Sequence, residues 1–197
     1  NDLGVIIADV SGKGFSAALV TMMIHTITKS HGFQKNKTNS ILYKINEVLT
    51  SNQNNQKIKT IKSFATVFCG YLDYNRKIFY YTNAGHLPLI VYKPLIDKFI
   101  FIQPNSKPVG ISDNFVYHVD NFKVQKKDIL ILYSDGITET INKNEEEFGL
   151  DRLINIIKNN YYLKSKELGE LIINNVINFS ENNEQFDDIT LIIMKIN

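Results

Sequence analysis

The stretch Val5-Ile6-Ile7-Ala8-Asp9-Val10-Ser11-Gly12-Lys13-Gly14 decides the fold. Its first four residues are all apolar, which predicts a buried strand rather than a strand with one wet face. Asp9 lies where this strand leaves the core, and a carboxylate there needs a cation or hydrogen-bond donors. The glycines that follow allow a tight turn and a close approach of the backbone to a ligand. We therefore predict that Asp9 holds metal ions.

Length and composition bound the class of protein. The chain has 197 residues, enough for one large domain, and no stretch has the composition of a linker. A hydrophobic fraction of 44% and a charged fraction of 21% are ordinary for a globular domain with a sizeable core. The formal net charge is +2 and the lysines are scattered, so nucleic-acid binding has no electrostatic footprint. We also expect no direct membrane insertion, because no apolar run approaches the roughly 20 residues that cross a bilayer.

Cys69 is the sole cysteine and lies in Thr66-Val67-Phe68-Cys69-Gly70-Tyr71, which is typical of a strand. A buried structural thiol is the expected role. A nucleophile is the weaker alternative, because no His or Arg cluster lies nearby in the sequence. The absence of cysteine pairs fits a reducing cytoplasm.

Two helical patterns follow the glycine turn. The first predicts a helix from 15 to about 30, which stops at His31-Gly32. Its predicted inner face is Phe15, Ala18, Leu19, Met22 and Thr26. Thr38-Asn39-Ser40 predicts the cap of a second helix. The predicted inner face of that helix is Ile41, Ile45, Val48 and Leu49.

From Ser63 the hydrophobic period becomes that of strands separated by short turns. The predicted strands are 63–73, 77–82, 89–92, 98–102, 115–124 and 128–133. A succession of hairpins is typical of antiparallel sheets. Helical patterns return at 150–157 and 168–177, and the chain closes with an apolar strand. Helices at both ends of a run of strands predict an α+β fold.

Three strongly apolar strands carry an acid at one end. Asp9 and Asp135 follow C-terminal ends, whereas Asp187 and Asp188 precede the N-terminal end of the last strand. If that strand runs antiparallel to the other two, all these acids gather at one edge. Clustered carboxylates need a cation to stay ionised, and oxygen ligands without His or Cys favour Mg²⁺ or Mn²⁺. For any single acid the alternative is a simple turn residue.

Four motifs together carry a family resemblance. In chain order they are Ala8-Asp9-Val10-Ser11-Gly12-Lys13-Gly14, Asn83-Ala84-Gly85-His86-Leu87-Pro88, Tyr133-Ser134-Asp135-Gly136-Ile137-Thr138-Glu139 and Asp187-Asp188-Ile189-Thr190. Two lesser motifs are Lys107-Pro108-Val109-Gly110 and Glu147-Phe148-Gly149-Leu150-Asp151-Arg152-Leu153. In this order the motifs resemble bacterial SpoIIE/RsbU-type phosphatases, which belong to the PPM (type 2C-like) serine/threonine phosphatases. The resemblance covers essentially the whole chain.

The resemblance implies a four-layer αββα sandwich, in which two antiparallel β-sheets are flanked by helices, with a two-metal site at one edge. It makes Asp9 the ligand that bridges two Mn²⁺ or Mg²⁺ ions and places the Val10 carbonyl on the second ion. Asp135 and Asp187 would hold the first ion. The family pattern favours Asp187 over Asp188, and adjacent strand side chains point opposite ways, so one of the two is expected to reach the site.

The family also has an earlier Gly-Gly-Asp motif, on a preceding strand, that completes the second metal position. This motif is absent from the chain, which begins at Asn1. We therefore expect residues 1–197 to form one phosphatase domain whose N-terminal strands are missing. Such a fragment is expected to bind metal poorly and to hydrolyse slowly or not at all.

The predicted function is hydrolysis of phosphoserine or phosphothreonine on a signalling regulator, with direct attack by a water that two metals activate and no phosphoenzyme. The predicted catalytic residues are Asp9, Asp135 and Asp187. The resemblance implies a STAS-type (anti-anti-sigma) substrate, an N-terminal sensor domain in the full-length protein and a cytoplasmic location. Membrane anchoring of that sensor and homodimerisation stay open.

Two other functions compete with this one. A non-catalytic PPM-fold binding module would keep the fold without metal chemistry, but all three acids are present. A different two-metal enzyme, such as a phosphodiesterase or nucleotide cyclase, usually needs added His ligands or a nucleotide-binding loop, and the sequence offers neither.

Two further residues are candidates for the site. Lys13 is a candidate phosphate contact, although a solvated lysine is the simpler interpretation. The Gly12-Lys13 pair is not a P-loop, because Ile7 stands where the first glycine should be. His86, between Gly85 and Pro88, is expected to fix a turn rather than to act in catalysis.

Overall fold

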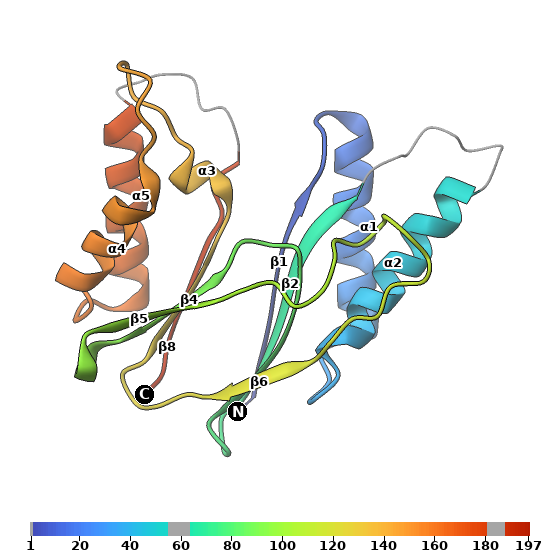
Figure 1. The fold of residues 1–197 in the computed structure, drawn as a ribbon, viewed down its shortest axis with the longest axis horizontal. Helices are drawn as coiled ribbons and strands as arrows, with labels where there is room; N and C mark the ends of the chain where they lie inside the picture. Colours follow the sequence, from blue (N-terminus) through green and yellow to red (C-terminus); the bar gives the residue numbers. More distant parts are fainter. Residues whose placement is uncertain (1, 55–63, 181–187) are drawn as a thin grey trace. The chain divides into compact units, whose positions relative to one another are not determined.

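The computed structural model describes residues 2–54, 64–180 and 188–197. These residues form eight strands and five α-helices, which divide into two compact units. The first unit is Asn1–His86 with Pro104–Val124, and the second is Leu87–Gln103 with Gln125–Asn197. Each unit holds one four-stranded antiparallel sheet and its own helices (Figure 1). The predicted α+β class, with two antiparallel sheets flanked by helices, is confirmed.

The first unit is built on a sheet with the strand order β1-β2-β3-β6. Its elements are β1 (Leu3–Val10), α1 (Phe15–His31), α2 (Thr38–Asn54), β2 (Ala65–Asp73), β3 (Ile78–Ala84) and β6 (Asp120–Lys123). One buried core joins Val20 and Ile24 of α1 and Ile45 of α2 to Val67 and Cys69 of β2. Helices α1 and α2 therefore cover one face of this sheet (Figure 1).

The first strand is only partly as predicted. Val5 and Ile7 are buried, but Ile6 is half-buried and Ala8 is exposed. The expectation of a strand buried at every position is therefore wrong. The physical reason is that β1 lies at the edge of the sheet formed by the described strands, where the helix-side residues are covered incompletely.

The predicted inner face of α1 is also wrong. Phe15 is 79% exposed and Met22 is 60% exposed, whereas Val20, Ile24 and Thr28 are buried. This helix is apolar around most of its circumference, so apolar spacing alone does not set its rotation. The buried residues are spaced four apart and share one face. In α2 the prediction holds for Ile41, Ile45 and Leu49, which are buried, whereas Val48 is half-buried.

One predicted strand is much shorter than expected. Within residues 115–124 only Asp120–Lys123 is a strand. Before it, Tyr117 is buried and its backbone bonds to side chains of α2: its N–H donates to the Tyr43 hydroxyl at 3.1 Å, and its carbonyl accepts from Asn39 at 3.0 Å. These bonds replace a strand ladder.

The second unit is built on a sheet with the strand order β5-β4-β7-β8. Its elements are β4 (Leu89–Lys93), the 3₁₀ helix η1 (Pro94–Ile96), β5 (Lys98–Ile102), β7 (Ile129–Tyr133), α3 (Asp135–Thr138), α4 (Gly149–Asn159), α5 (Ser165–Ser180) and β8 (Leu191–Lys195). All five residues of β7 are buried, as predicted. One core joins Ile131 and Tyr133 of β7 to Leu153 of α4 and to Leu168 and Ile172 of α5.

Among the described residues, no helix has both the length and the apolar character needed to cross a membrane.

Candidate metal centre

Asp9 and Val10 are the last two residues of β1, and backbone geometry fixes the loop that follows them in the first unit. Ser11 closes it onto the start of β2: its N–H donates to the Phe64 carbonyl at 2.9 Å, and its hydroxyl accepts from the Phe64 N–H at 3.0 Å. Gly12 and Gly14 have φ angles of 92° and 80°, which residues with a Cβ rarely adopt. The loop thus turns sharply from β1 into α1.

Asp9 lies on the sheet face opposite to the helices. It is half-buried and has the same strand parity as Val5 and Ile7, whereas Ile6 packs against the core under α1 and α2. Its cross-strand neighbour is Thr66. Asp9 therefore lies at the C-terminal end of β1, on the face of the sheet that does not pack against α1 and α2.

His86 fixes a turn beside this position, as the sequence predicted. Its ring Nδ1 is hydrogen-bonded to the Thr66 hydroxyl at 3.0 Å, and its N–H donates to the Asn83 side chain at 2.8 Å. Gly85 in this turn has a φ of 72°, and a Cβ on it would lie 2.5 Å from the Pro108 ring. His86 thereby ties the turn after β3 to the residue opposite Asp9.

The second unit brings two acid-bearing segments together through Ser134. The Ser134 hydroxyl donates to the Asp188 carbonyl at 2.8 Å and accepts from the Thr190 N–H at 2.9 Å. The Ser134 N–H also donates to the Thr190 carbonyl at 3.0 Å. Asp135 follows Ser134 directly, so the end of β7 and the segment that precedes β8 are held side by side.

Asp135 is the first residue of the short helix α3, which holds its backbone. The Glu139 N–H donates to the Asp135 carbonyl at 2.8 Å, and the Thr140 hydroxyl donates to the Gly136 carbonyl at 2.6 Å. Asp135 itself is half-buried, and Gly136 and Ile137 after it are buried. A carboxylate in this position is held at a partly open edge by a well-packed turn.

The two lesser motifs, at 107–110 and 147–153, have structural roles, because their residues hold neighbouring elements in place. In the second unit, Arg152 donates to the carbonyls of Glu147 and Phe148, each at 2.9 Å, and lies over the Phe179 ring at 4.7 Å. These contacts fix the start of α4.

In the first unit, Val109 and Ala65 bond through both backbone groups, at 2.9 and 3.0 Å, and the Gly110 N–H donates to the Asn46 side chain at 2.8 Å. This segment is thus attached to both β2 and α2.

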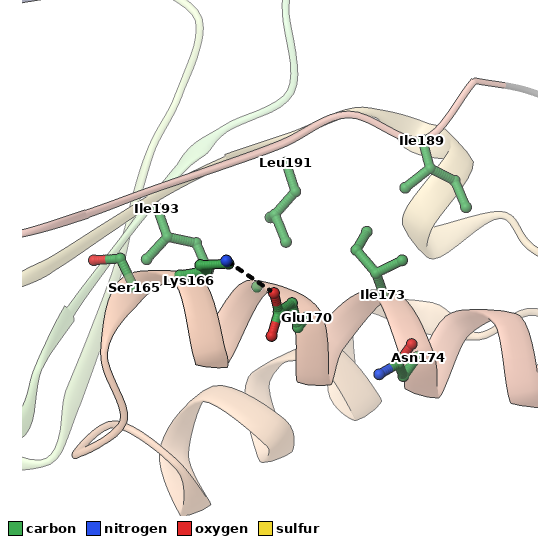
Figure 2. Close-up of a pocket in the computed structure, with 9 residues that line it drawn as sticks. Ser165, Lys166, Glu170, Ile173, Asn174, Ile189, Leu191 and Ile193 are labelled. Atoms are coloured by element: carbon green, nitrogen blue, oxygen red, sulfur yellow. Dashed lines mark ion pairs between the residues drawn. The ribbon is translucent and has the colours of Figure 1, made fainter.

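A groove of about 790 Å³ runs between α5 and β8, close to the acid-bearing segment (Figure 2). Ile189, Leu191 and Ile193 line one side of it, and Ile173 lines the other. Its charged lining residues, Lys166 and Glu170, pair with each other at 3.8 Å. The groove is therefore mainly apolar and does not have the character of a phosphate or metal site.

Comparison with known proteins decides the family. The protein-family model described as "Stage II sporulation protein E (SpoIIE)" matches residues 1–197 of this chain. The chain belongs to the SpoIIE family. This family is the SpoIIE/RsbU branch of the PPM-type phosphatases, so the resemblance inferred from the motifs is confirmed.

Individual members and neighbours agree. "Phosphoserine phosphatase RsbU" of Bacillus subtilis is 27% identical over 195 residues, which cover 98% of this chain and 55% of RsbU. The SiaA-PP2C domain of Pseudomonas aeruginosa superposes with a TM-score of 0.79 at 16% identity, covering 100% of this chain and 80% of that one. RsbX, solved in complex with magnesium, has a TM-score of 0.69 at 17% identity, covering 100% and 82%. The chain thus spans about half the length of RsbU and shares its fold with PP2C domains.

The structure places the expected SpoIIE-family ligands as follows. Asp9 and Val10 belong to the first unit, and Asp135 belongs to the second beside the Asp188 segment. Asp187 lies outside the described residues. Within either unit, the described residues include no group of three His, Cys, Asp or Glu side chains arranged to hold a metal ion. The meeting of Asp9 with Asp135 and Asp187 stays a prediction.

Two weaker candidates are now clearer. Cys69 is completely buried, and burial raises the pKa of its thiol to about 12, so it is a structural residue and not a nucleophile at neutral pH. Lys13 is exposed in the loop before α1, and its part in phosphate binding stays a prediction.

Sequence reasoning missed the hydroxyls of Ser134 and Ser11. In the sequence, Ser134 stands out only as part of a motif, and Ser11 only as part of the turn. The usable signal was a serine within two residues of an acid at a strand end, since serine can bond to backbone groups of a neighbouring segment. Its actual partners could not be read from the sequence, because Asp188 lies 54 residues away.

Proposed function

We propose that residues 1–197 are a metal-dependent phosphatase domain that hydrolyses phosphoserine or phosphothreonine on a protein. The observation that carries the proposal is the contact, in the second unit, between the segments that bear Asp135 and Asp188. Membership of the SpoIIE family supports it, as does the likeness to RsbU, which is named a phosphoserine phosphatase.

The predicted donors are all oxygen atoms, which supports Mg²⁺ or Mn²⁺ as the ions of the proposed site. Asp9 would bridge the ions, the Val10 carbonyl would bind the second, and Asp135 and Asp187 would bind the first. Hard oxygen donors of this kind match both cations, and RsbX was solved with magnesium. When bound, the ions lower the pKa of the attacking water and neutralise charge on the phosphoryl oxygens.

The chain's own residues orient these donors. Ser11 and the two glycines set the direction in which the backbone leaves Asp9, and Ser134 sets the spacing between Asp135 and the segment before β8. Held donors of this kind lower the cost of organising the site when substrate binds. Lys13, exposed on the loop that follows Asp9 and Val10, is proposed as a contact for the substrate phosphate.

Partners follow from the family and are part of the proposal. The substrate is proposed to be a phosphorylated STAS-type regulator. In the longer protein, an N-terminal sensor domain would control this domain. We place the domain in the cytoplasm, and homodimerisation is a state to be tested by light scattering.

The test is Mn²⁺-dependent release of phosphate from a phosphoserine peptide, with the matched phosphotyrosine peptide as a control for substrate class. The 197-residue chain is compared with a version extended along its natural sequence to include the Gly-Gly-Asp motif of the family. Activity that requires Mn²⁺ and is higher in the longer version supports the proposal. Inactivity of both versions, together with no Mn²⁺ binding by calorimetry, would contradict it and favour a binding module.

A further inference from the structure

A second pocket in the second unit, of about 610 Å³, is lined by four lysines. We call it the basic pocket, and its lysines are Lys126, Lys127, Lys164 and Lys195. Among the described residues that line it, none is an Asp or a Glu. We infer that the basic pocket binds an acidic segment of another protein. This inference is independent of the proposed phosphatase activity.

The basic pocket is separate from the acid-bearing segments of the same unit. The β7–β8 ladder pairs Ile129 with Lys195 at the pocket, and it pairs Tyr133 with Leu191 at its other end. Asp135 follows Tyr133 closely at that other end. At the usual rise of a strand, roughly 13 Å separates the two ends of the ladder. A ligand in the basic pocket is therefore distinct from one at the proposed metal centre.

Three of the four ammonium groups are available to a ligand. Lys126, Lys127 and Lys164 are exposed, and none of them forms an ion pair with the residues in 2–54, 64–180 and 188–197. Glu167 accepts from the Lys164 backbone N–H at 2.9 Å, so its carboxylate caps the start of α5. The formal net charge of the chain is only +2, so three unpaired cations around one pocket are a local excess. Such an excess attracts and orients an acidic partner.

The fourth lysine holds the pocket together. Lys195 is half-buried, and its ammonium group donates to the carbonyls of Tyr161 and Leu163, which attaches the segment before α5 to β8. Leu163, Ile196 and the 71% exposed Tyr162 also line the pocket and give it apolar surface. Apolar surface with cations on separate segments matches a peptide that carries several carboxylates and an apolar side chain. A single phosphate is instead held by donors that converge on one point.

Lys127 has a backbone conformation that is unfavourable for lysine. Its φ angle is 74°, in the left-handed region, and its N–H donates to the Ile196 carbonyl at 2.7 Å. Glycine would occupy this position without the steric cost of a Cβ. The chain therefore carries a lysine here at a cost in stability, which a role of the side chain in binding explains.

The test measures binding of a fluorescein-labelled peptide of six glutamates and two leucines to the full chain by fluorescence anisotropy. The same peptide with glutamine in place of glutamate is the neutral probe. One variant combines the three substitutions Lys126→Gln, Lys127→Gln and Lys164→Gln. The matched control also removes three exposed lysines, none of which lines the pocket, through Lys37→Gln, Lys98→Gln and Lys123→Gln.

We expect the wild type to bind the acidic peptide, more weakly as salt rises, and to bind the neutral probe far less. The triple pocket variant should lose about 10-fold in affinity, with the control close to the wild type. Lys127→Gly should also weaken binding while its melting temperature stays the same or rises, which separates loss of binding from loss of the fold. In an NMR titration, the amide signals of Lys127, Lys164 and Ile196 should shift.

Three results would overturn the inference. The first is no binding of the acidic peptide, or equal binding of the neutral probe. The second is an equal loss in the pocket variant and the control, which would mean that only the net charge of the chain matters. The third is tighter binding of a single-stranded thymidine oligonucleotide, which would make the ligand a nucleic acid. None of these results bears on the proposed phosphatase activity.

Discussion

The molecule has two acid-bearing loops, residues 9–14 in the first unit and residues 134–135 with 188–190 in the second, and they are held in different ways. In the first unit the loop after Asp9 gets its course from Gly12 and Gly14, with Ser11 attaching it to the backbone of Phe64. In the second unit the acid follows a buried Ser134 whose hydroxyl bonds to a distant segment. Positive φ angles distinguish the first loop, and a buried hydroxyl that bonds to a distant segment distinguishes the second.

This difference predicts different weaknesses. A loop set by positive φ angles is sensitive to any Cβ at its glycines, even where there is open space for one. A segment set by one buried hydroxyl tolerates backbone-neutral changes but not loss of the polar atom. The two loops should therefore respond to different substitutions, and both should affect the same activity if they serve one site.

The largest expected effect comes from the acids themselves. Asp135→Asn and Asp9→Asn should each lower kcat roughly 10³-fold or more, because each removes a charged ligand proposed to organise the metal-assisted step. The substitutions are made in a chain whose unsubstituted form is active. The measurement is its Mn²⁺-dependent release of phosphate, and circular dichroism shows whether the fold is kept. Asp151→Asn, at an exposed acid in the first turn of α4, is the matched control and should retain activity.

These two variants also test the comparison between the loops. Equal losses would mean that each unit contributes an essential acid to one site. Near-native activity of Asp135→Asn would refute the assignment of the site. Loss with Asp135→Asn but not with Asp9→Asn would confine the chemistry to the second unit and remove Asp9 from the metal centre.

The next largest effect is on the free energy of unfolding, which a glycine-to-alanine substitution should lower at one position and raise at another. Gly12→Ala adds no close contact but places a Cβ at a φ of 92°, so it should lower the free energy of unfolding by about 1–2 kcal/mol. Gly169→Ala lies within α5, where the new Cβ would meet Ile193 at an ordinary 3.9 Å, and should raise the free energy of unfolding by about 0.5–1 kcal/mol. Urea unfolding monitored by circular dichroism measures both.

Mn²⁺ binding by the same two variants sharpens this second prediction. Gly12→Ala should also weaken Mn²⁺ binding, because the strained turn moves the backbone near Val10, whereas Gly169→Ala should leave Mn²⁺ binding unchanged. If Gly12→Ala were as stable as the wild type, backbone conformation would not be what defines the first loop.

The fold was largely predictable because most elements have one clear apolar period. All five residues of β7 are apolar and all five are buried. In α2, the residues Ile41, Ile45 and Leu49 stand out from polar neighbours, so the inner face was clear. In α1 nearly every side is apolar, and the buried row of Val20 and Ile24 could be chosen only by packing against the sheet.

The candidate site was predictable in its residue types but not in its construction. Acids at the ends of apolar strands, in the order of known motifs, pointed to Asp9 and Asp135. The residues that hold them depend on contacts between distant segments, such as Ser134 with Thr190 or Thr66 with His86. Such partners follow from strand order and register, which a single sequence determines only weakly.

The smallest expected effect is a pH dependence in the hairpin between β2 and β3 of the first unit, at the opposite end of the β1–β2 pair from Asp9. Asp73 is buried there and forms an ion pair with Lys35, and its side chain accepts from the Arg76 N–H at 3.0 Å. The hydrogen bond from Lys35, and then the one from Arg76, lower the pKa of the Asp73 carboxyl. A lowered folded-state pKa gives stability that is present above the unfolded value of about 3.9 and is lost as the pH falls through the folded one. Asp73→Asn should therefore be less stable than the wild type at pH 7, and the difference should shrink below about pH 4. Urea unfolding at pH 7, 4 and 3 measures it, with Asp151→Asn as the exposed control. If the difference in free energy of unfolding between the wild type and Asp73→Asn stays constant with pH, Asp73 acts by packing and hydrogen bonding alone. The first unit would then have no charge-dependent weak point in this hairpin, and its sensitivity to substitution would lie in the loop after Asp9.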